Sequence, residues 1–309
     1  MNHPKRKLIP DEQTIVVLDT SPVRNIAYAD AIPAWVTTFA EMADDGYAFS
    51  LADGALAELL AQYNRGSLSD VDLTKILAAI SQFLNPDLPI LPGKRDIMAM
   101  IGESMDKEWS EDDVREYAFR GWTVLNDPSL LDEDRREELT QTLQYDRDEW
   151  ISSFRKFDKG YTRWTAALPG REQQELNQYR HDLLDEELAD LAARGRNAHP
   201  TMAMRLDLQM RYLWRQWVRT RQKKGGYDPT NVKKVNDGID LDLYRYLMLP
   251  ALVVSDDRGF HEGLMDIKSY QRHWLWRPQA LADAWGRGER PQPVWPAPVI
   301  EPLETQNAG

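Results

Sequence analysis

The sequence predicts an α/β protein in which helices flank a parallel sheet and a large all-helical insertion interrupts the fold. Three observations support this class. Short apolar runs alternate with segments of helical periodicity up to about residue 92. The strand pattern is then absent over 94–235, where charged segments with helical spacing dominate. It returns at 251–254, so we expect a sheet assembled from both ends of the chain.

The first strand is expected at 14–18, where every residue is apolar or β-branched. Such a run suits a strand that is covered on both faces. It stops at Asp19, and a second strand is expected at 47–51. The weak third strand is expected at 88–91, between prolines. The helices expected between these strands are 31–44, 54–63 with Asp53 as N-cap, and a helix from Ser69 or Asp70 to about Leu84.

The insertion is expected to be helical because its apolar residues recur every three or four positions. Ser110 and Asp113 predict a capping box at its first helix. Its expected helices are 110–125, 128–157, 171–194 and 201–222. A helix at 237–248 and a buried strand at 251–254 follow it. The predicted organisation is a discontinuous core of 14–92 and 236–262, the insertion 94–235, an aromatic-rich helical cover 263–288, and a tail 289–309 with five prolines.

Composition excludes several function classes. The 309 residues include no cysteine, which rules out disulfides, thiolate metal sites and cysteine nucleophiles. The five histidines are scattered, so a zinc site is not expected. No apolar run approaches the roughly 20 residues that a membrane helix needs, and we expect a soluble, cytoplasmic chain. Phosphate-cradling and dinucleotide-binding glycine motifs are absent as well.

Charge is unevenly distributed along the chain. The net charge is −12, yet 205–234 carries +7, which leaves −19 on the rest. An overall acidic chain does not coat nucleic acid with its whole surface, but this segment provides a local basic track. We expect phosphate contacts from five of its side chains. They are Arg215, Arg219, Arg221, Lys223 and Lys224.

Acidic residues follow the predicted strands or lie in the helices beside them. Asp19 ends the first strand, and Asp256 and Asp257 follow the last one. Ligands of open parallel sheets bind beyond the carboxyl ends of the strands, where these side chains would meet. Glu58 lies in an apolar helix, and Asp237 and Asp240 open another helix one turn apart.

Four or five carboxylates cannot crowd together without a counter-charge, because repulsion and desolvation would raise their pKa values. Oxygen ligands without sulfur favour Mg²⁺ or Mn²⁺. Such a centre typically serves phosphate chemistry. The sequence therefore predicts a divalent-cation site at this edge of the sheet.

The order of these motifs resembles the PIN-domain family of metal-dependent ribonucleases. The matching segments are Val16–Ser21 (an apolar strand followed by Asp-Thr-Ser), Glu58 in its Ala/Leu-rich helix, Asn236–Asp240 at a helix start, and Ser255–Phe260 after the last strand. Asp240 and Asp257 are 17 residues apart, close to the usual helix-plus-strand length. The resemblance covers 14–92 and 236–262. The long insertion and Ser255, where the family usually has Thr, depart from the pattern.

The resemblance implies a Mg²⁺- or Mn²⁺-dependent endonuclease that acts on RNA by in-line attack of an activated water. Asp19, Glu58, Asp240 and Asp257 would be catalytic and, with Asp237, metal-binding. Thr20, Ser21, Ser255 and Asp256 would support them. The resemblance also suggests a toxin or defence effector controlled by an inhibitory or regulatory protein, and it leaves a homo-oligomer open.

Other interpretations of the same residues stay open. Asp19 and Asp237 could serve as helix caps, Glu58 as a surface acid and Asp256 as a solvent-facing residue. The tryptophans at 214 and 217 suit core packing better than base stacking. A catalytically inactive binding protein and a structure-specific 5′-nuclease on DNA are the alternative functions. A haloacid-dehalogenase-type phosphatase is rejected, because its Asp-x-Asp motif is absent at Asp19.

Overall fold

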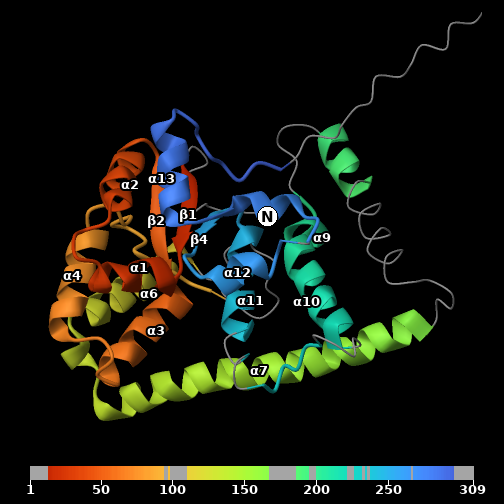
Figure 1. The fold of residues 1–309 in the computed structure, drawn as a ribbon, viewed down its shortest axis with the longest axis horizontal. Helices are drawn as coiled ribbons and strands as arrows, with labels where there is room; N and C mark the ends of the chain where they lie inside the picture. The colour runs from red at the N-terminus through yellow and green to blue at the C-terminus, as the bar shows by residue number, and fades with distance from the viewer. Residues whose placement is uncertain are drawn as a thin grey trace, which may run out of the picture.

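The computed structural model describes residues 13–93, 97, 110–166, 186–194, 200–220, 226–231, 234, 237–265 and 267–295. In this part of the chain, five parallel strands form one sheet in the order β3-β2-β1-β4-β5 (Figure 1). Helices flank the sheet, as the predicted α/β class requires. The strands are β1 (Thr14–Leu18), β2 (Tyr47–Ala52), β3 (Ile90–Leu91), β4 (Leu252–Val254) and β5 (Leu275–Trp276).

The central strand β1 explains why the two ends of the chain form one sheet. Val16 of β1 pairs with Phe49 of β2 on one side and with Leu252 of β4 on the other. Val16, Val17 and Leu18 are fully buried, which is the pattern of a strand covered on both faces. Because all strands are parallel, their carboxyl ends lie at one edge of the sheet.

Most helices around the sheet were predicted, but the helix directly after β1 and the short helix directly after β4 were not. The sequence predicted no helix directly after β1, but α1 begins at Thr20, because the side chain of Asp19 caps its first backbone N–H. Pro22 is accommodated since it lies in the first turn, where helices tolerate proline. The helices of this group are α1 (Thr20–Tyr28), α2 (Ala34–Asp44), α3 (Asp53–Asn64), α4 (Asp70–Ile80), α12 (Arg258–Glu262) and α13 (Pro278–Gly286).

Two caps in this half of the chain differ in outcome. Ser69 forms a capping box with Asp72 at the start of α4, so its predicted role as N-cap is confirmed. Asp53 was expected to cap α3, but it lies within the first turn of that helix, whose N-cap is Ala52. The carboxylate of Asp53 instead accepts the backbone N–H of Gly93 at 3.2 Å. It therefore ties the start of α3 to the segment that follows β3.

The described part of the insertion is helical, as predicted. Its first helix starts at the expected Ser110–Asp113 capping box. Two expected helices are divided in the structure, at Leu131–Asp132 and at Leu206. Residues 171–185 of the expected 171–194 helix lie outside the described residues, and 186–193 are helical. The elements are α6 (Glu111–Asn126), η1 (Pro128–Leu130), α7 (Glu133–Ala166), α9 (Met202–Arg205) and α10 (Asp207–Thr220), followed by α11 (Asp237–Arg245) and η3 (Tyr246–Met248).

The long helix α7 joins the insertion to the rest of the molecule. At 34 residues it extends about 51 Å, since an α-helix rises 1.5 Å per residue. It passes below α3, α11 and α10 and contacts all three (Figure 1). Residues of α6, α7 and α10 belong to the same apolar core as the sheet. The insertion therefore packs as part of one core with the α/β unit.

The segment predicted only as a cover contributes to the sheet. Within 263–288, η4 (Tyr270–Trp274) leads into β5, which pairs with β4. The sheet thus extends past residue 262, the expected end of the core. Beyond α13, the start of the proline-rich tail lies along the body, where Trp295 packs against the rings of Tyr270 and Trp274.

The aromatic residues of α10 serve the core. Trp214 and Trp217 are stacked with ring centroids 4.8 Å apart and are 4% and 8% exposed. This confirms core packing as their use. Arg211 of the same helix is also buried, against Asp207, with an N–O distance of 2.7 Å. Among the described helices, none combines the length and apolarity needed to cross a membrane.

Candidate active site

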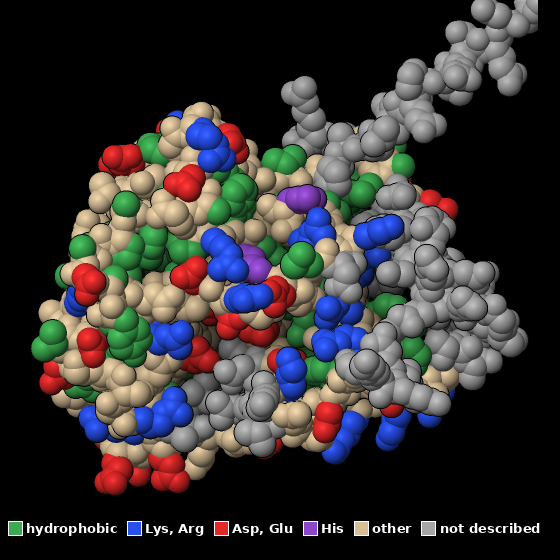
Figure 2. All heavy atoms as spheres, in the orientation of Figure 1, with side chains coloured by type: hydrophobic (Ala, Val, Ile, Leu, Met, Phe, Trp, Pro, Cys, Tyr) green, Lys and Arg blue, Asp and Glu red, His purple; other side chains and the backbone are tan. Residues whose placement is uncertain are grey.

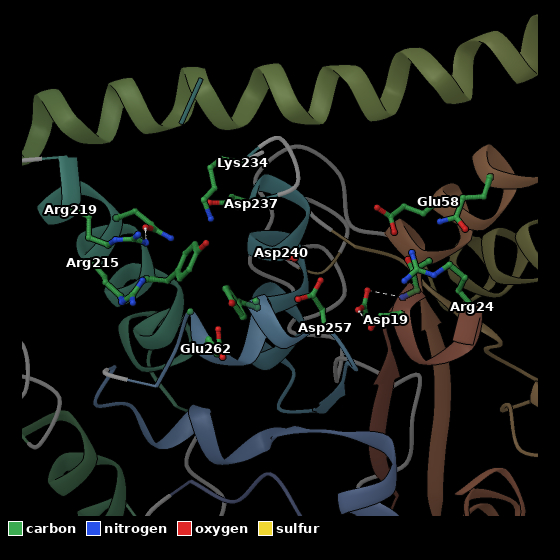
Figure 3. Close-up of a pocket in the computed structure, with 18 of the residues that line it drawn as sticks. Asp19, Arg24, Glu58, Arg215, Arg219, Lys234, Asp237, Asp240, Asp257 and Glu262 are labelled. Carbon is green, nitrogen blue, oxygen red and sulfur yellow. Dashed lines mark hydrogen bonds between the residues drawn. The ribbon is translucent and has the colours of Figure 1, made fainter. Parts of the chain in front are cut away.

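A pocket of about 600 Å³ opens beside the carboxyl ends of β1 and β4 (Figure 3). Asp19, Asp240 and Asp257 lie at its centre, with Glu58 on the side of α3. Asp237 and Glu262 also line it. The structure thus places all five acids that the sequence selected as metal ligands around one pocket, although they come from segments more than 200 residues apart.

Asp19 is the most firmly held of these acids. Its Oδ1 atom accepts the backbone N–H of Thr20 at 2.6 Å, and its Oδ2 atom accepts hydroxyl hydrogen bonds from Ser21 and Ser255, each at 2.7 Å. Both serines are buried. Asp19 is therefore the cap of α1, as one interpretation proposed, and at the same time a pocket residue with a fixed orientation.

Ser21 and Ser255 have the same pattern of hydrogen bonds. The backbone N–H of Asp256 donates to Ser21 Oγ at 2.8 Å, and that of Asp257 donates to Ser255 Oγ at 3.2 Å. Each serine therefore accepts from the backbone after β4 and donates its proton to Asp19. The loop that carries Asp257 is joined to Asp19 through these hydroxyls.

The turn after β4 sets the position of Asp257. Its carboxylate caps α12 by accepting the backbone N–H of Phe260 at 3.0 Å. His261 Nε2 lies 2.7 Å from the carbonyl oxygen of Ser255 and closes the same turn. Phe260 is buried and stacks on Tyr244 of α11 with centroids 4.8 Å apart. This packing brings the start of α11, which carries Asp240, next to Asp257.

Burial acts on the two acids of α11 that line the pocket, Asp237 and Asp240, and repulsion from other carboxylates acts on Asp240. Burial, followed by the charges of the surrounding carboxylates, holds the pKa of Asp240 well above its usual range. Those carboxylates are Asp19, Asp237, Asp257 and Glu58. Burial also raises the pKa of Asp237, while a hydrogen bond from Tyr227 and the charges of Lys234 and Arg219 oppose that rise. Burial and the neighbouring carboxylates therefore both disfavour the charged form of Asp240.

Cationic side chains border this acidic centre on two sides. Arg215 and Arg219 approach it from α10, while Arg24 lies on the opposite side (Figure 3). Arg65, the C-cap residue of α3, and Lys234 complete the basic lining. In the space-filling view, red carboxylates occupy the hollow and blue Lys and Arg side chains surround it (Figure 2). Such a distribution suits a ligand that carries several negative charges.

The remaining predicted residues have different positions. Thr20 and Ser21 line the pocket. Asp256 is absent from the lining, since its carboxylate accepts from Asn25 at 2.9 Å and pairs with Arg277 at 3.5 Å. Asp256 was interpreted as a solvent-facing residue, and its side chain is 36% exposed in this pair. Arg221, Lys223 and Lys224 lie outside the described residues.

Sequence reasoning did not select four charged residues of the lining as site residues. They are Arg24, Arg65, Lys234 and Glu262. Helical spacing would have found two of them, because Arg24 is four residues after Thr20 and Arg65 is seven residues after Glu58. The sequence gives a weaker indication of a site role for Glu262, because its i,i+4 pair with Arg258 is typical of an ordinary helix surface.

The acids surround the pocket without forming a finished ligand set. Within the described ranges, no three His, Cys, Asp or Glu side chains are arranged closely enough to hold a metal ion. Their chemistry nevertheless fits a hard divalent cation, because every donor is a carboxylate oxygen. A cation would also offset the repulsion from the surrounding carboxylates, which is the second cause, after burial, of the raised pKa of Asp240.

The fold and the site together define a class: an α/β protein with a carboxylate-rich pocket, bordered by cations, at the carboxyl edge of a parallel sheet. No protein-family model, curated protein or solved structure matches this chain.

Proposed function

We propose that this protein is a metal-dependent endonuclease that hydrolyses phosphodiester bonds in RNA. The observation that carries the proposal is the pocket at the ends of β1 and β4, where acids from both ends of the chain gather between two groups of cations. Carboxylates of this kind hold Mg²⁺ or Mn²⁺, and flanking cations neutralise phosphates. The order of the acids along the chain, which resembles PIN-domain ribonucleases, supports RNA as the substrate.

The roles of the residues follow from their positions. Asp19, Glu58, Asp240 and Asp257 would hold the cation, with Asp237 as a further ligand. A bound divalent cation supplies positive charge to the reacting phosphate and lowers the pKa of a water molecule. Ser21 and Ser255 keep Asp19 in one orientation through their hydroxyl hydrogen bonds.

The cations on either side have a separate task. Arg215 and Arg219 of α10 would bind phosphates on one side of the scissile bond, and Arg24 on the other. A guanidinium binds a phosphate through paired N–H donors, which gives orientation as well as charge. A substrate that spans both groups must continue past the cleaved bond in both directions. This favours cleavage inside a strand over removal of terminal nucleotides.

The decisive experiment incubates the purified protein with Mn²⁺ and labelled single-stranded RNA. The rate of cleavage should fall by about 100-fold or more in Asp19→Asn and in Asp257→Asn. The reason is that a divalent cation contributes several kcal/mol to the stabilisation of the transition state, and it depends on its ligands. Asp87→Asn, an exposed acid remote from the pocket lining, is the matched control and should keep full activity. Cleavage that survives both pocket substitutions would overturn the proposal. Preferential cleavage of branched DNA in the same assay would redirect it to a structure-specific 5′-nuclease.

One observation favours a second candidate, a catalytically inactive binding protein. Among the described residues the acids do not form a ready metal site. In that case RNA would bind with a dependence on the α10 arginines, but Mn²⁺ would produce no cleavage. An inhibitory protein partner, and with it a toxin or defence role, stays a prediction from the resemblance.

A further inference from the structure

One acid of the pocket is held by residues that the α/β core does not supply. Asp237 opens α11 and is 9% exposed. A carboxylate removed from water to this degree needs hydrogen-bond partners, because a buried polar group without them is costly. The hydroxyl of Tyr227, which precedes α11 in the insertion, forms a hydrogen bond with it.

The direction of this hydrogen bond is set by a second residue of the insertion. The indole Nε1 of Trp150, on α7, lies 3.0 Å from the hydroxyl oxygen of Tyr227. An indole N–H can only donate, so the Tyr227 oxygen must accept it. The tyrosine proton is then directed to its other partner, Asp237. Three groups therefore form an ordered chain from Trp150 through Tyr227 to Asp237.

Packing fixes the two aromatic members of this chain. Trp150 is 3% exposed and Tyr227 is 5% exposed. Phe154, one turn after Trp150, packs on the Tyr227 ring with centroids 5.7 Å apart. The guanidinium of Arg219, a pocket residue, lies 5.8 Å from the centre of the same ring. The helix α7, which carries Trp150, also packs against α3 and α11, and both of these helices contribute residues to the pocket lining.

We propose that Trp150 and Tyr227 are positioning residues, through which the helical insertion orients Asp237 toward the cation that the pocket binds. The inference rests on the proposed function. A carboxylate offers about four acceptor positions, so the bond from Tyr227 leaves Asp237 able to bind a cation or its water. The insertion is then a working part of the active site in addition to any role in binding substrate.

The test compares Tyr227→Phe with Tyr270→Phe. Each change removes one hydroxyl and keeps the ring, but the Tyr270 hydroxyl donates to the carbonyl oxygen of Met204 at 2.8 Å, away from the pocket lining. Tyr227→Phe should lower Mn²⁺ affinity, measured by calorimetry, and kcat about tenfold, with little change in the KM for RNA, because partners of metal ligands commonly contribute 10–100-fold. Tyr270→Phe should change neither.

Two further measurements separate positioning from general support of the fold. Raising the Mn²⁺ concentration should restore the activity of Tyr227→Phe, because a weakened cation site fills at a higher cation concentration. In an Asp237→Asn background, adding Tyr227→Phe should cause no further loss, because the two residues act through one contact.

The outcomes distinguish this inference from the proposed function. If the wild type binds Mn²⁺ and cleaves RNA while Tyr227→Phe behaves like Tyr270→Phe, the positioning role is wrong and the nuclease proposal stands. If the wild type neither binds Mn²⁺ nor cleaves RNA, the nuclease proposal is wrong and the positioning role falls with it. Independent, additive losses in the double variant would also overturn the positioning role.

Discussion

Ser255, at the end of β4, donates a 2.7 Å hydrogen bond to Oδ2 of Asp19, at the end of β1, across 236 positions of sequence. The pairing of the two strands makes this contact, since Leu18 and Val254 are partners in the parallel ladder. Asp19 N also donates to the carbonyl oxygen of Val254 at 2.9 Å. The orientation of the central acid is thus determined by the sheet itself.

The first prediction concerns Ser255, which is fully buried. Ser255→Ala removes a donor from the Asp19 carboxylate and an acceptor from the N–H of Asp257. The free energy of unfolding should fall by about 1–3 kcal/mol, the range for hydrogen bonds to charged groups and buried unsatisfied donors. Urea denaturation measures it. Ser81→Ala, which removes an exposed hydroxyl bonded to Leu77 O, is the control and should cost less than about 0.5 kcal/mol.

The second prediction concerns pH and Asp240. Its pKa in the folded protein is above the value of about 3.9 in an unfolded chain, chiefly because of burial. The stabilising contribution of its neutral form is complete below about pH 4 and is lost as pH rises toward the folded pKa. Asp240→Asn removes this pH-dependent loss.

In EDTA, Asp240→Asn should therefore be more stable than the wild type at pH 7, and the two should be similar near pH 4. Thermal melts at both pH values provide the comparison. A wild type that is the more stable protein at pH 7 would show that the ionised Asp240 is not under net repulsion in the folded state.

The third prediction concerns the divalent cation. A ligand that binds only the folded state stabilises it by about 2.7 kcal/mol at a concentration of 100 times its Kd. Mn²⁺ should therefore raise the Tm of the wild type by several degrees at pH 7. The increase should be largely absent in Asp19→Asn, because this substitution removes one carboxylate charge from the site and leaves the other acids unchanged. An equal Tm increase in both proteins would locate the binding of Mn²⁺ elsewhere.

The fourth prediction concerns the cations that border the pocket. Arg24→Gln should weaken binding of single-stranded RNA and reduce the slope of log affinity against log salt by about 0.7, the value for one phosphate contact on a single strand. Fluorescence anisotropy over a salt series measures both quantities. Arg287→Gln removes an equal charge beyond α13, outside the pocket lining, and should leave the slope unchanged. Equal effects of the two variants would mean that the pocket cations act only through net charge.

Local patterns in the sequence were sufficient for much of the fold. The apolar run 14–18, the capping residue expected at Ser69 or Asp70 and the capping box at Ser110 predicted their elements, because burial and capping act within a few residues. The two-residue strand β5 was missed, since so short a strand leaves no periodic signal. The helix α1 was also missed, because Asp19 and Pro22 resemble a turn as well as a helix start.

For the site, the sequence by itself determined which acids follow strands and which lie on helices, since those positions depend on local periodicity. The tertiary structure decided which groups face one another. Parallel pairing of β1 with β4 brought Ser255 to Asp19, and the packing of α7 brought Trp150 to Tyr227 and thereby to Asp237. Contacts between residues 77 or 236 positions apart depend on how buried surfaces fit together, and no local pattern encodes that fit.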